Sequence, residues 1–270
     1  MFDATRQPGM QRSQGEAAVA FDGARLARLY QQGSAKALLP HVRGTPEVVF
    51  LNTSGGLTSG DRLNYALDLA GGARVVATTQ AAERAYRADH GPAQVRVAHQ
   101  VGPGGWLDWL PQETILFDRA DLTRETCITL APDAGCLMLE AVVLGRAAMG
   151  ETLRDLQFSD IRRIERAGKP IFLEPFLLNS NILARGARSA LLGSARAFAT
   201  LVLAAPGAED AVQAARAALD EPGVEAAASA LDGLCVVRML APDGWPLRKQ
   251  IVKLMGALRR GAAPPRVWQL

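Results

Sequence analysis

The sequence predicts a mainly β protein with an α+β C-terminal part, in which a sandwich or stack of strands is accompanied by two helices. Over the first two-thirds of the chain, short runs of apolar and β-branched residues alternate with glycine, proline and aspartate breaks. The runs recur about every ten to fourteen residues, and no helical pattern of the kind found in βαβ units separates them. The last third differs, because two helical patterns occur between its strand-like runs.

The β-rich body is expected over residues 17–196. The run Arg62–Leu69 shows the pattern clearly, since its apolar side chains alternate with polar or small ones and share one face of a strand. The apolar face consists of Leu63, Tyr65, Leu67 and Leu69. The predicted strands are Ala17–Asp22, Arg25–Gln31, Val48–Asn52, Arg62–Leu69, Arg74–Thr79, Gln94–Val101, Trp106–Leu110, Thr114–Phe117, Leu122–Leu130, Leu137–Leu144, Leu153–Ile164 and Ile171–Leu177.

The C-terminal segment, residues 197–270, is expected to follow the order β-α-β-β-α. Its first helix is alanine-rich with acidic residues in the first turn, and Asp232-Gly233 is suited to a hairpin turn between two strands. The last helix starts at Pro246, carries an apolar stripe at helical spacing and stops at Gly261. The stripe is Ile251, Leu254, Met255 and Leu258. The predicted elements are the strands Ala197–Ala205, Val224–Ser229 and Leu234–Leu240 and the helices Glu209–Leu219 and Leu247–Arg260.

Composition narrows the class of protein. The chain has 270 residues, of which 49% are hydrophobic and 21% charged, as in ordinary globular domains. A formal net charge of +3 without a long Lys/Arg run argues against nucleic acid. No apolar stretch is long enough for a membrane span. Residues 1–16 are polar and lack the apolar region of a signal peptide, so we expect a disordered N-terminal lead before a single domain over 17–270.

The metal-binding residue types are few and scattered. The three histidines form no H-x₃-H or H-E-x-x-H spacing, and no C-x-x-C occurs. We therefore expect surface or hydrogen-bonded histidines, no tightly bound metal, no disulfide framework and a cytoplasmic protein. The residues concerned are His41, His90, His99, Cys127, Cys136 and Cys235.

The stretch Asn52–Arg62, NTSGGLTSGDR, is the most informative in the chain. Gly55 and Gly60 have the spacing of the two glycines in the phosphate-binding pattern G-x-x-x-x-G-K-[ST]. Asp61 stands where the lysine of that pattern would reach the phosphates, so like charges would meet there. At ~4 Å such a pair repels by about 4 kcal/mol at an effective dielectric near 20. We expect a tight turn that binds no nucleotide, in which Asp61 either caps the loop's own amides or faces a cation.

Carboxylates in apolar strands are the remaining candidates for chemistry. Glu113 and Glu140 both lie in stretches otherwise suited to the core. A bare buried carboxylate costs several kcal/mol, so each must be paired, hydrogen-bonded or hydrated. One interpretation is a structural ion pair, such as Arg146 with Glu140. The other is that several carboxylates, with Glu151 and Glu174, line a passage that binds a divalent cation weakly. A carboxylate-based hydrolase is the enzymatic alternative.

The C-terminal tail holds two residue types that are enriched at interface hot spots, Arg266 and Trp268. They are predicted to bind a partner protein. The alternative is that Trp268 docks onto its own domain.

Six motifs follow one another along the chain, namely Leu51–Leu63, Thr78–Arg87, Trp109–Phe117, Gly145–Glu151, Trp245–Arg248 and Pro265–Trp268. In this order they resemble the urease accessory protein D family, called UreD or, in some systems, UreH. The resemblance covers residues 17–270. Ser59 departs from it, because the family commonly has another glycine there. Serine is small, so we expect an effect only if this position requires a positive φ.

The resemblance implies a β-helix-like stack of strands with two helices and a non-enzymatic role in nickel insertion. Members of the family bind apo-urease, recruit UreF and the GTPase UreG, and are thought to provide an internal route for nickel to the urease active site. Nickel would be in transit and not a tightly bound cofactor. The residues expected to line this passage or to anchor its loops are Asp61, Glu83, Glu113, Glu140 and Glu151.

Overall fold

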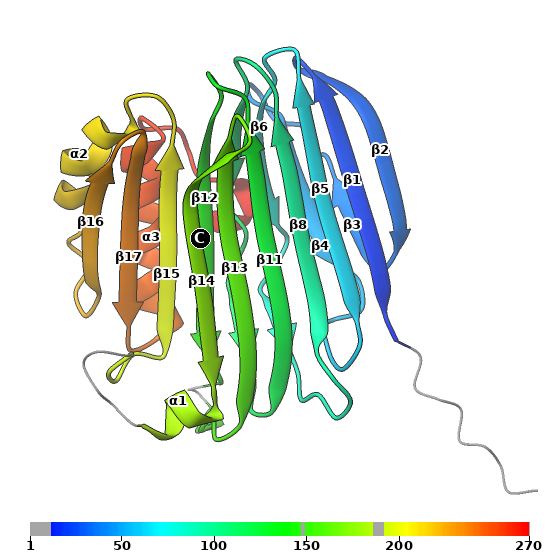
Figure 1. The fold of residues 1–270 in the computed structure, drawn as a ribbon, viewed down its shortest axis with the longest axis vertical. Helices are drawn as coiled ribbons and strands as arrows, with labels where there is room; N and C mark the ends of the chain where they lie inside the picture. The colour runs from blue at the N-terminus through cyan, green and yellow to red at the C-terminus, as the bar shows by residue number, and fades with distance from the viewer. Residues whose placement is uncertain (1–11, 147–148, 186–191, 270) are drawn as a thin grey trace, which may run out of the picture.

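The structure is a computed structural model that describes residues 12–146, 149–185 and 192–269. Through the central part of the chain the strands pass back and forth between two facing sheets, so the chain coils as a β-solenoid (Figure 1). Helices are few and the two longer ones lie near the C-terminus. The predicted mainly β class, with stacked strands and C-terminal helices, is therefore confirmed. None of the helices in the described part of the chain has the length and apolar character needed to cross a membrane.

The first sheet has seven strands in the order β14-β13-β11-β8-β5-β1-β2. Its five central strands run parallel, as expected for successive coils of a solenoid, and β2 and β14 flank them antiparallel. The strands are β1 (Gln14–Asp22), β2 (Arg25–Gly33), β5 (Arg62–Ala70), β8 (Ala93–Val101), β11 (Ala120–Leu130), β13 (Leu156–Arg166) and β14 (Lys169–Asn179).

The second sheet follows the order β16-β17-β15-β12-β9-β6-β4-β3, with β10 beside β12 and β7 beside β10. Strands β4, β6, β9 and β12 are parallel, and antiparallel strands continue the sheet on both sides. The strands are β3 (Ala35–Leu38), β4 (Glu47–Asn52), β6 (Arg74–Thr79), β7 (Glu83–Ala85), β9 (Trp106–Trp109), β10 (Thr114–Leu116), β12 (Gly135–Leu144), β15 (Ala197–Ala204), β16 (Glu225–Leu231) and β17 (Leu234–Ala241).

The main core fills the space between the two sheets. Strand β5 shows how the sequence builds it, because the predicted apolar face from Leu63 to Leu69 is buried while the intervening side chains point outward. Full burial of one leucine contributes about 1.5–3 kcal/mol. The interior is therefore apolar by default, and polar groups that occur in it require a structural or functional reason.

A second core lies between the second sheet and the helix α3 (Gly244–Leu258). The predicted stripe from Ile251 to Leu258 is buried there. The helix begins three residues before the predicted element Leu247–Arg260, because the side chain of Asp243 accepts a hydrogen bond from the backbone N–H of Trp245 and caps it. The first predicted helix is shorter than expected and divides into a 3₁₀ turn, Ala208–Ala211, and α2 (Val212–Ala217).

Some short elements were not predicted. Strands β3 and β7 have four and three residues, too few for a recognisable alternation, and the five-residue helix α1 (Ser180–Ala184) and the 3₁₀ turn Arg266–Trp268 are also new. The predicted disordered lead was wrong at its end, because β1 starts at Gln14 and pairs with β5 from there. Residues 1–11 of that lead lie outside the described residues.

Candidate functional site

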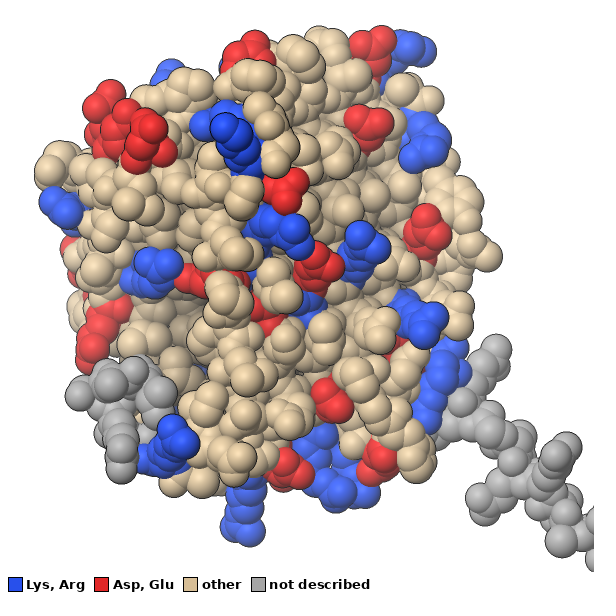
Figure 2. Space-filling view, viewed as in Figure 1, with Lys and Arg blue, Asp and Glu red and all other residues tan. Residues whose placement is uncertain are grey.

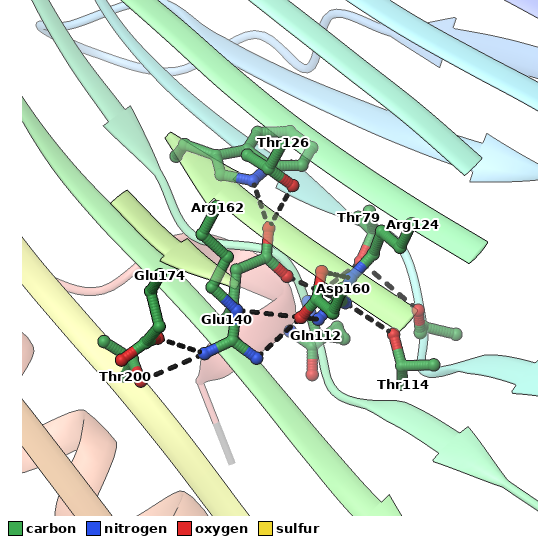
Figure 3. A network of polar contacts seen from close by, with 12 residues as sticks. Thr79, Gln112, Thr114, Arg124, Thr126, Glu140, Asp160, Arg162, Glu174 and Thr200 are labelled. Carbon is green, nitrogen blue, oxygen red and sulfur yellow. Dashed lines mark hydrogen bonds and ion pairs between the residues drawn. The ribbon is translucent and has the colours of Figure 1, made fainter. Parts of the chain in front are cut away.

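Charged side chains meet inside the solenoid, between β11, β12 and β13 (Figure 3). Strand alternation points Arg124, Glu140, Asp160 and Arg162 inward, among positions that are otherwise apolar. Each of the four is at most 5% exposed. Because a buried charge costs several kcal/mol unless it is paired, these four groups must form ion pairs with one another.

Glu140 lies at the inner end of this network. Its carboxylate receives Arg124 Nη1 at 2.8 Å, Thr126 Oγ1 at 2.8 Å and Trp109 Nε1 at 3.2 Å. The predicted ion pair between Glu140 and Arg146 is therefore wrong. Strand β12 ends at Leu144, so Arg146 lies beyond it on the surface, whereas Glu140 faces the interior.

Asp160 is held by two guanidinium groups. Arg124 donates to it from Nη2 at 2.6 Å and Nε at 2.9 Å, and Arg162 donates from Nε at 2.8 Å. Burial alone would raise the pKa of Asp160, but the two guanidinium groups outweigh this effect and hold the pKa below its ordinary value. Asp160 is therefore a fixed anion and a poor source of protons.

The network continues outward to the surface. Arg162 Nη1 donates to Glu174 at 2.9 Å and to Thr200 at 3.0 Å, and the half-exposed Arg238 donates to the other oxygen of Glu174 at 2.8 Å. A hollow of about 390 Å³ opens there between β14 and strands β15–β17. Figure 2 shows this face of the molecule, on which basic and acidic side chains are interspersed.

A small cavity of about 40 Å³ adjoins the inner end of the network. Arg124, Trp109, Thr114, Tyr65 and Glu83 are among the residues that line it. A cavity needs only about 10–15 Å³ and polar partners to hold a water molecule, so this cavity can be hydrated. It shares Tyr65 and Glu83 with a further hollow of about 130 Å³ next to the glycine loop.

Glu83 stands between these two spaces. Burial raises its pKa to about 7, against the lowering effect of the Asn52 amide, which donates to both carboxylate oxygens at 3.3 Å. Near neutral pH this carboxyl group is divided between its protonated and ionised forms. It can therefore exchange its proton with water in the adjoining spaces.

The glycine loop connects β4 to β5. A phosphate-binding loop of the G-x-x-x-x-G-K-[ST] type leads into a helix, whereas this loop leads into a strand. Gly55, Gly56 and Gly60 have positive φ values, which glycine adopts readily. Asp61 accepts hydrogen bonds from the backbone N–H of Ser13 at 2.7 Å and of Thr58 at 2.9 Å. Of the two alternatives for Asp61, the structure shows the capping of nearby backbone amides.

Ser59 has a structural role in the same loop. Its hydroxyl oxygen accepts hydrogen bonds from the backbone N–H of Asp89 at 2.6 Å and of His90 at 3.0 Å. Its φ is not among the positive values. The substitution of the family's glycine by serine is thus accommodated without strain, as expected.

Of the other two predicted carboxylates, Glu113 directly precedes β10 and Glu151 lies in the connection between β12 and β13. Glu113 approaches Arg248 at 3.6 Å. Glu151 accepts hydrogen bonds from Arg146 N and Nε at 2.9 and 3.0 Å and from the backbone N–H of Asp118. Of the five predicted carboxylates, Glu83 therefore lines the interior cavity, and Glu140 lies behind its lining, in contact with Arg124 and Trp109.

The C-terminal residues pack against the body of the protein. Trp268 is 1% exposed and its Nε1 donates to Leu110 O at 2.9 Å. Of the two alternatives for Trp268, the structure therefore shows docking onto its own domain. Its burial leaves no indole surface for a partner. Arg266 donates to His41 O at 2.9 Å and remains exposed.

Arg124, Asp160 and Arg162 were not predicted. A usable signal was present, because Asp160 and Arg162 share the phase of the buried Phe158 and Ile164 along β13. His99 was also unexpected, since it is fully buried, its ring lies 4.7 Å from that of Trp109, and both its nitrogens lack a partner among the described residues. Burial lowers its pKa to about 3. Within the described ranges, no group of three or more His, Cys, Asp or Glu side chains could hold a metal ion.

Comparison with known proteins gives one family. Residues 13–269 match the family model described as UreD urease accessory protein. The urease accessory protein UreD of Cereibacter sphaeroides is 63% identical over 265 residues, which cover 96% of this chain and 96% of that protein. UreD of Paracoccus denitrificans is 54% identical over 271 residues, covering 100% and 97%. UreD of Rhizobium leguminosarum bv. viciae is 45% identical over 265 residues, covering 96% of each.

Proposed function

Because the chain belongs to the UreD urease accessory protein family, we propose that it is a scaffold and nickel conduit for urease maturation. It would act in the cytoplasm, in a complex with UreF, UreG and apo-urease, and would pass nickel to the apo-enzyme as transient cargo. The accessory designation of its relatives implies a non-catalytic role.

The polar interior is the observation that supports a conduit. An ordinary solenoid core is apolar, yet here charged and hydroxyl groups follow one another from Glu83 through Arg124 and Asp160 to Glu174 at the surface. Carboxylate, hydroxyl and water oxygens bind divalent transition metals less tightly than imidazole or thiolate groups do. Such ligands suit a cation that must be released again.

The predicted passage residues enter the proposal with different weights. Glu83, which lines the interior cavity, and Glu140, which contacts its lining residues Trp109 and Arg124, are the main candidates. Asp61 would act by shaping the loop beside Glu83, because both of its oxygens are engaged by amides. Glu113 and Glu151 would act from the outer surface, as anchors or at an entrance.

A carboxylate-based hydrolase fits the geometry less well. Such an enzyme needs an acid and a base that are both free to reach one bond. Glu140 and Asp160 are each paired with arginine, and Asp61 is engaged by two amides, so Glu83 has no free carboxylate partner among these residues.

Nickel delivery at limiting metal tests the proposal. Glu140→Ala should leave the complex with UreF, UreG and apo-urease intact, but reduce the nickel delivered to urease and the resulting activity. Glu125→Ala is the matched control, because Glu125 lies on the outward face of the same strand as Arg124 and pairs with Arg163 at the surface. Urease activation by Glu140→Ala at the wild-type level would contradict the passage assignment, and no complex with any partner would contradict the scaffold.

A further inference from the structure

A groove of about 600 Å³ lies on the outer side of the second sheet, next to the start of α3. Its floor includes a row of three neighbouring residues, Arg84, Ile115 and Val143, from the parallel strands β7, β10 and β12. Ile115 faces outward, because Thr114 and Leu116 on either side of it point into the interior. This groove is therefore separated from the interior cavity by the sheet.

The groove carries an excess of positive charge. Four arginines line it against two carboxylates, and one of these, Asp243, is engaged in capping α3. Arg84 and Arg196 form no ion pair within the described residues. Arg196 is nevertheless fixed, because it donates to the carbonyl oxygens of Leu144 at 3.0 Å and Glu151 at 2.8 Å. The four arginines are Arg84, Arg146, Arg196 and Arg248.

Large apolar side chains stand exposed around these charges. Tyr86 is 39%, Trp245 50% and Met149 75% exposed. Aromatic residues, methionine and arginine are the types enriched at protein–protein interfaces, and Trp, Tyr and Arg dominate their energetic hot spots. A groove that combines these exposed apolar side chains with guanidinium groups that lack a carboxylate partner has the composition of a protein-binding surface.

We propose that this groove is a docking surface for an acidic, extended segment of a partner protein. Carboxylates of the segment would pair with Arg84, whose guanidinium group can form a strong bidentate contact, and with Nη1 of Arg196, because Nε and Nη2 of Arg196 already donate to backbone carbonyls. An apolar side chain would cover Ile115 and Val143 between Tyr86 and Trp245. The inference rests on the proposed function only in taking the urease-maturation proteins as the candidate partners.

Binding of the full chain to purified UreF, UreG and apo-urease, each alone, tests the surface at low and high salt. Arg84→Glu and Trp245→Ala should each weaken the binding of at least one of these proteins by tenfold or more. The effect of Arg84→Glu should shrink at high salt, where charge pairing is screened. Matched controls are Arg96→Glu and Tyr30→Ala, which change exposed residues of the first sheet and should leave binding within twofold.

The outcomes separate this inference from the proposed function. If wild-type protein binds its partners and both groove variants bind like the controls, the docking surface is refuted and the scaffold role stands. If wild-type protein binds none of the three, both are refuted. A self-associated dimer that only Arg84→Glu dissociates would assign the groove to a second copy and would also overturn the proposal. Circular dichroism of Arg84→Glu should match that of Arg96→Glu, because the Arg84 side chain donates no hydrogen bond and forms no ion pair within the described ranges.

Discussion

Replacing Arg124 by methionine should destabilise the protein by about 3–5 kcal/mol, the usual cost of breaking a buried ion pair. Arg124 is 5% exposed and bridges two buried carboxylates, with Nη1 2.8 Å from Glu140 and Nη2 2.6 Å from Asp160. Asp160 would keep Arg162. Glu140 would keep only neutral donors among the described residues, so most of the cost should come from its uncompensated charge.

A double-mutant cycle with Glu140→Gln isolates this effect from lost packing. Glu140→Gln alone leaves Arg124 paired with Asp160 and should cost about 1–3 kcal/mol. In the double variant no bare charge remains at position 140, so its loss should be smaller than the sum of the two single losses by about 1–3 kcal/mol. Equilibrium urea denaturation of the full chain, followed by circular dichroism, measures all three.

Two results would refute the reasoning. One is strict additivity of Arg124→Met and Glu140→Gln, and the other is a loss below about 1 kcal/mol for Arg124→Met. Glu125→Gln serves as the control, because its pair with Arg163 is more than one-third exposed on both sides. Exposed pairs of this kind contribute about 0–1 kcal/mol.

Three further predictions concern the glycine loop, the interior cavity and the C-terminus. Since burial raises the pKa of Glu83 from 4.5 to about 7, ionisation in the folded state should cost stability as pH rises through this interval. Glu83→Gln should therefore gain about 3 kcal/mol over wild type above pH 7 and nothing well below pH 4.5; parallel pH profiles of Tm would contradict this. Gly56→Ala would place a Cβ against the Tyr86 ring and 2.8 Å from Arg84 O at a φ of +146°, and should lose more stability than Gly72→Ala, whose Cβ meets nothing within 4 Å. A difference of about 1–3 kcal/mol between them is expected in urea denaturation. Trp268→Ala should cost about 3–5 kcal/mol in the same assay, and a loss below 1 kcal/mol would contradict docking of the indole in its own domain.

Sequence patterns predicted the strands and helices in which the alternation of apolar and polar residues continues over enough positions to be recognised. The face from Leu63 to Leu69 and the stripe from Ile251 to Leu258 were both found, because two-residue and 3.6-residue periods report directly which side of an element is buried. Strand β7 could not be found in this way. It has three residues, and its partner β10 comes thirty-one positions later in register, with Thr114 beside Glu83.

The candidate site was predicted less completely, because ion pairs inside a solenoid join residues that are far apart in the sequence, on facing strands or on successive coils. Glu140 was recognised as a carboxylate that needs a partner, but the partner was sought next to it in sequence at Arg146. The actual partner, Arg124, lies on the preceding strand β11 in the facing sheet, and it in turn faces Asp160, one coil later, through the register of β11 with β13. Which residues of β11, β12 and β13 lie opposite one another depends on the number of residues in each coil. The alternation within a single strand carries no information on that number.

The arrangement of charge in the interior limits how nickel could pass. Arg124 and Arg162 both contact Asp160, and arginine keeps its charge at all physiological pH values. A divalent cation ~4 Å from one guanidinium group would meet about 8 kcal/mol of repulsion at an effective dielectric near 20, which one carboxylate at the same distance would only just offset. Under the conduit proposal, the two arginines must therefore move away from Glu140 and Asp160 during transit. The ion pairs that stabilise the interior would then also keep it closed to cations until a partner or the cation itself supplies the energy to separate them.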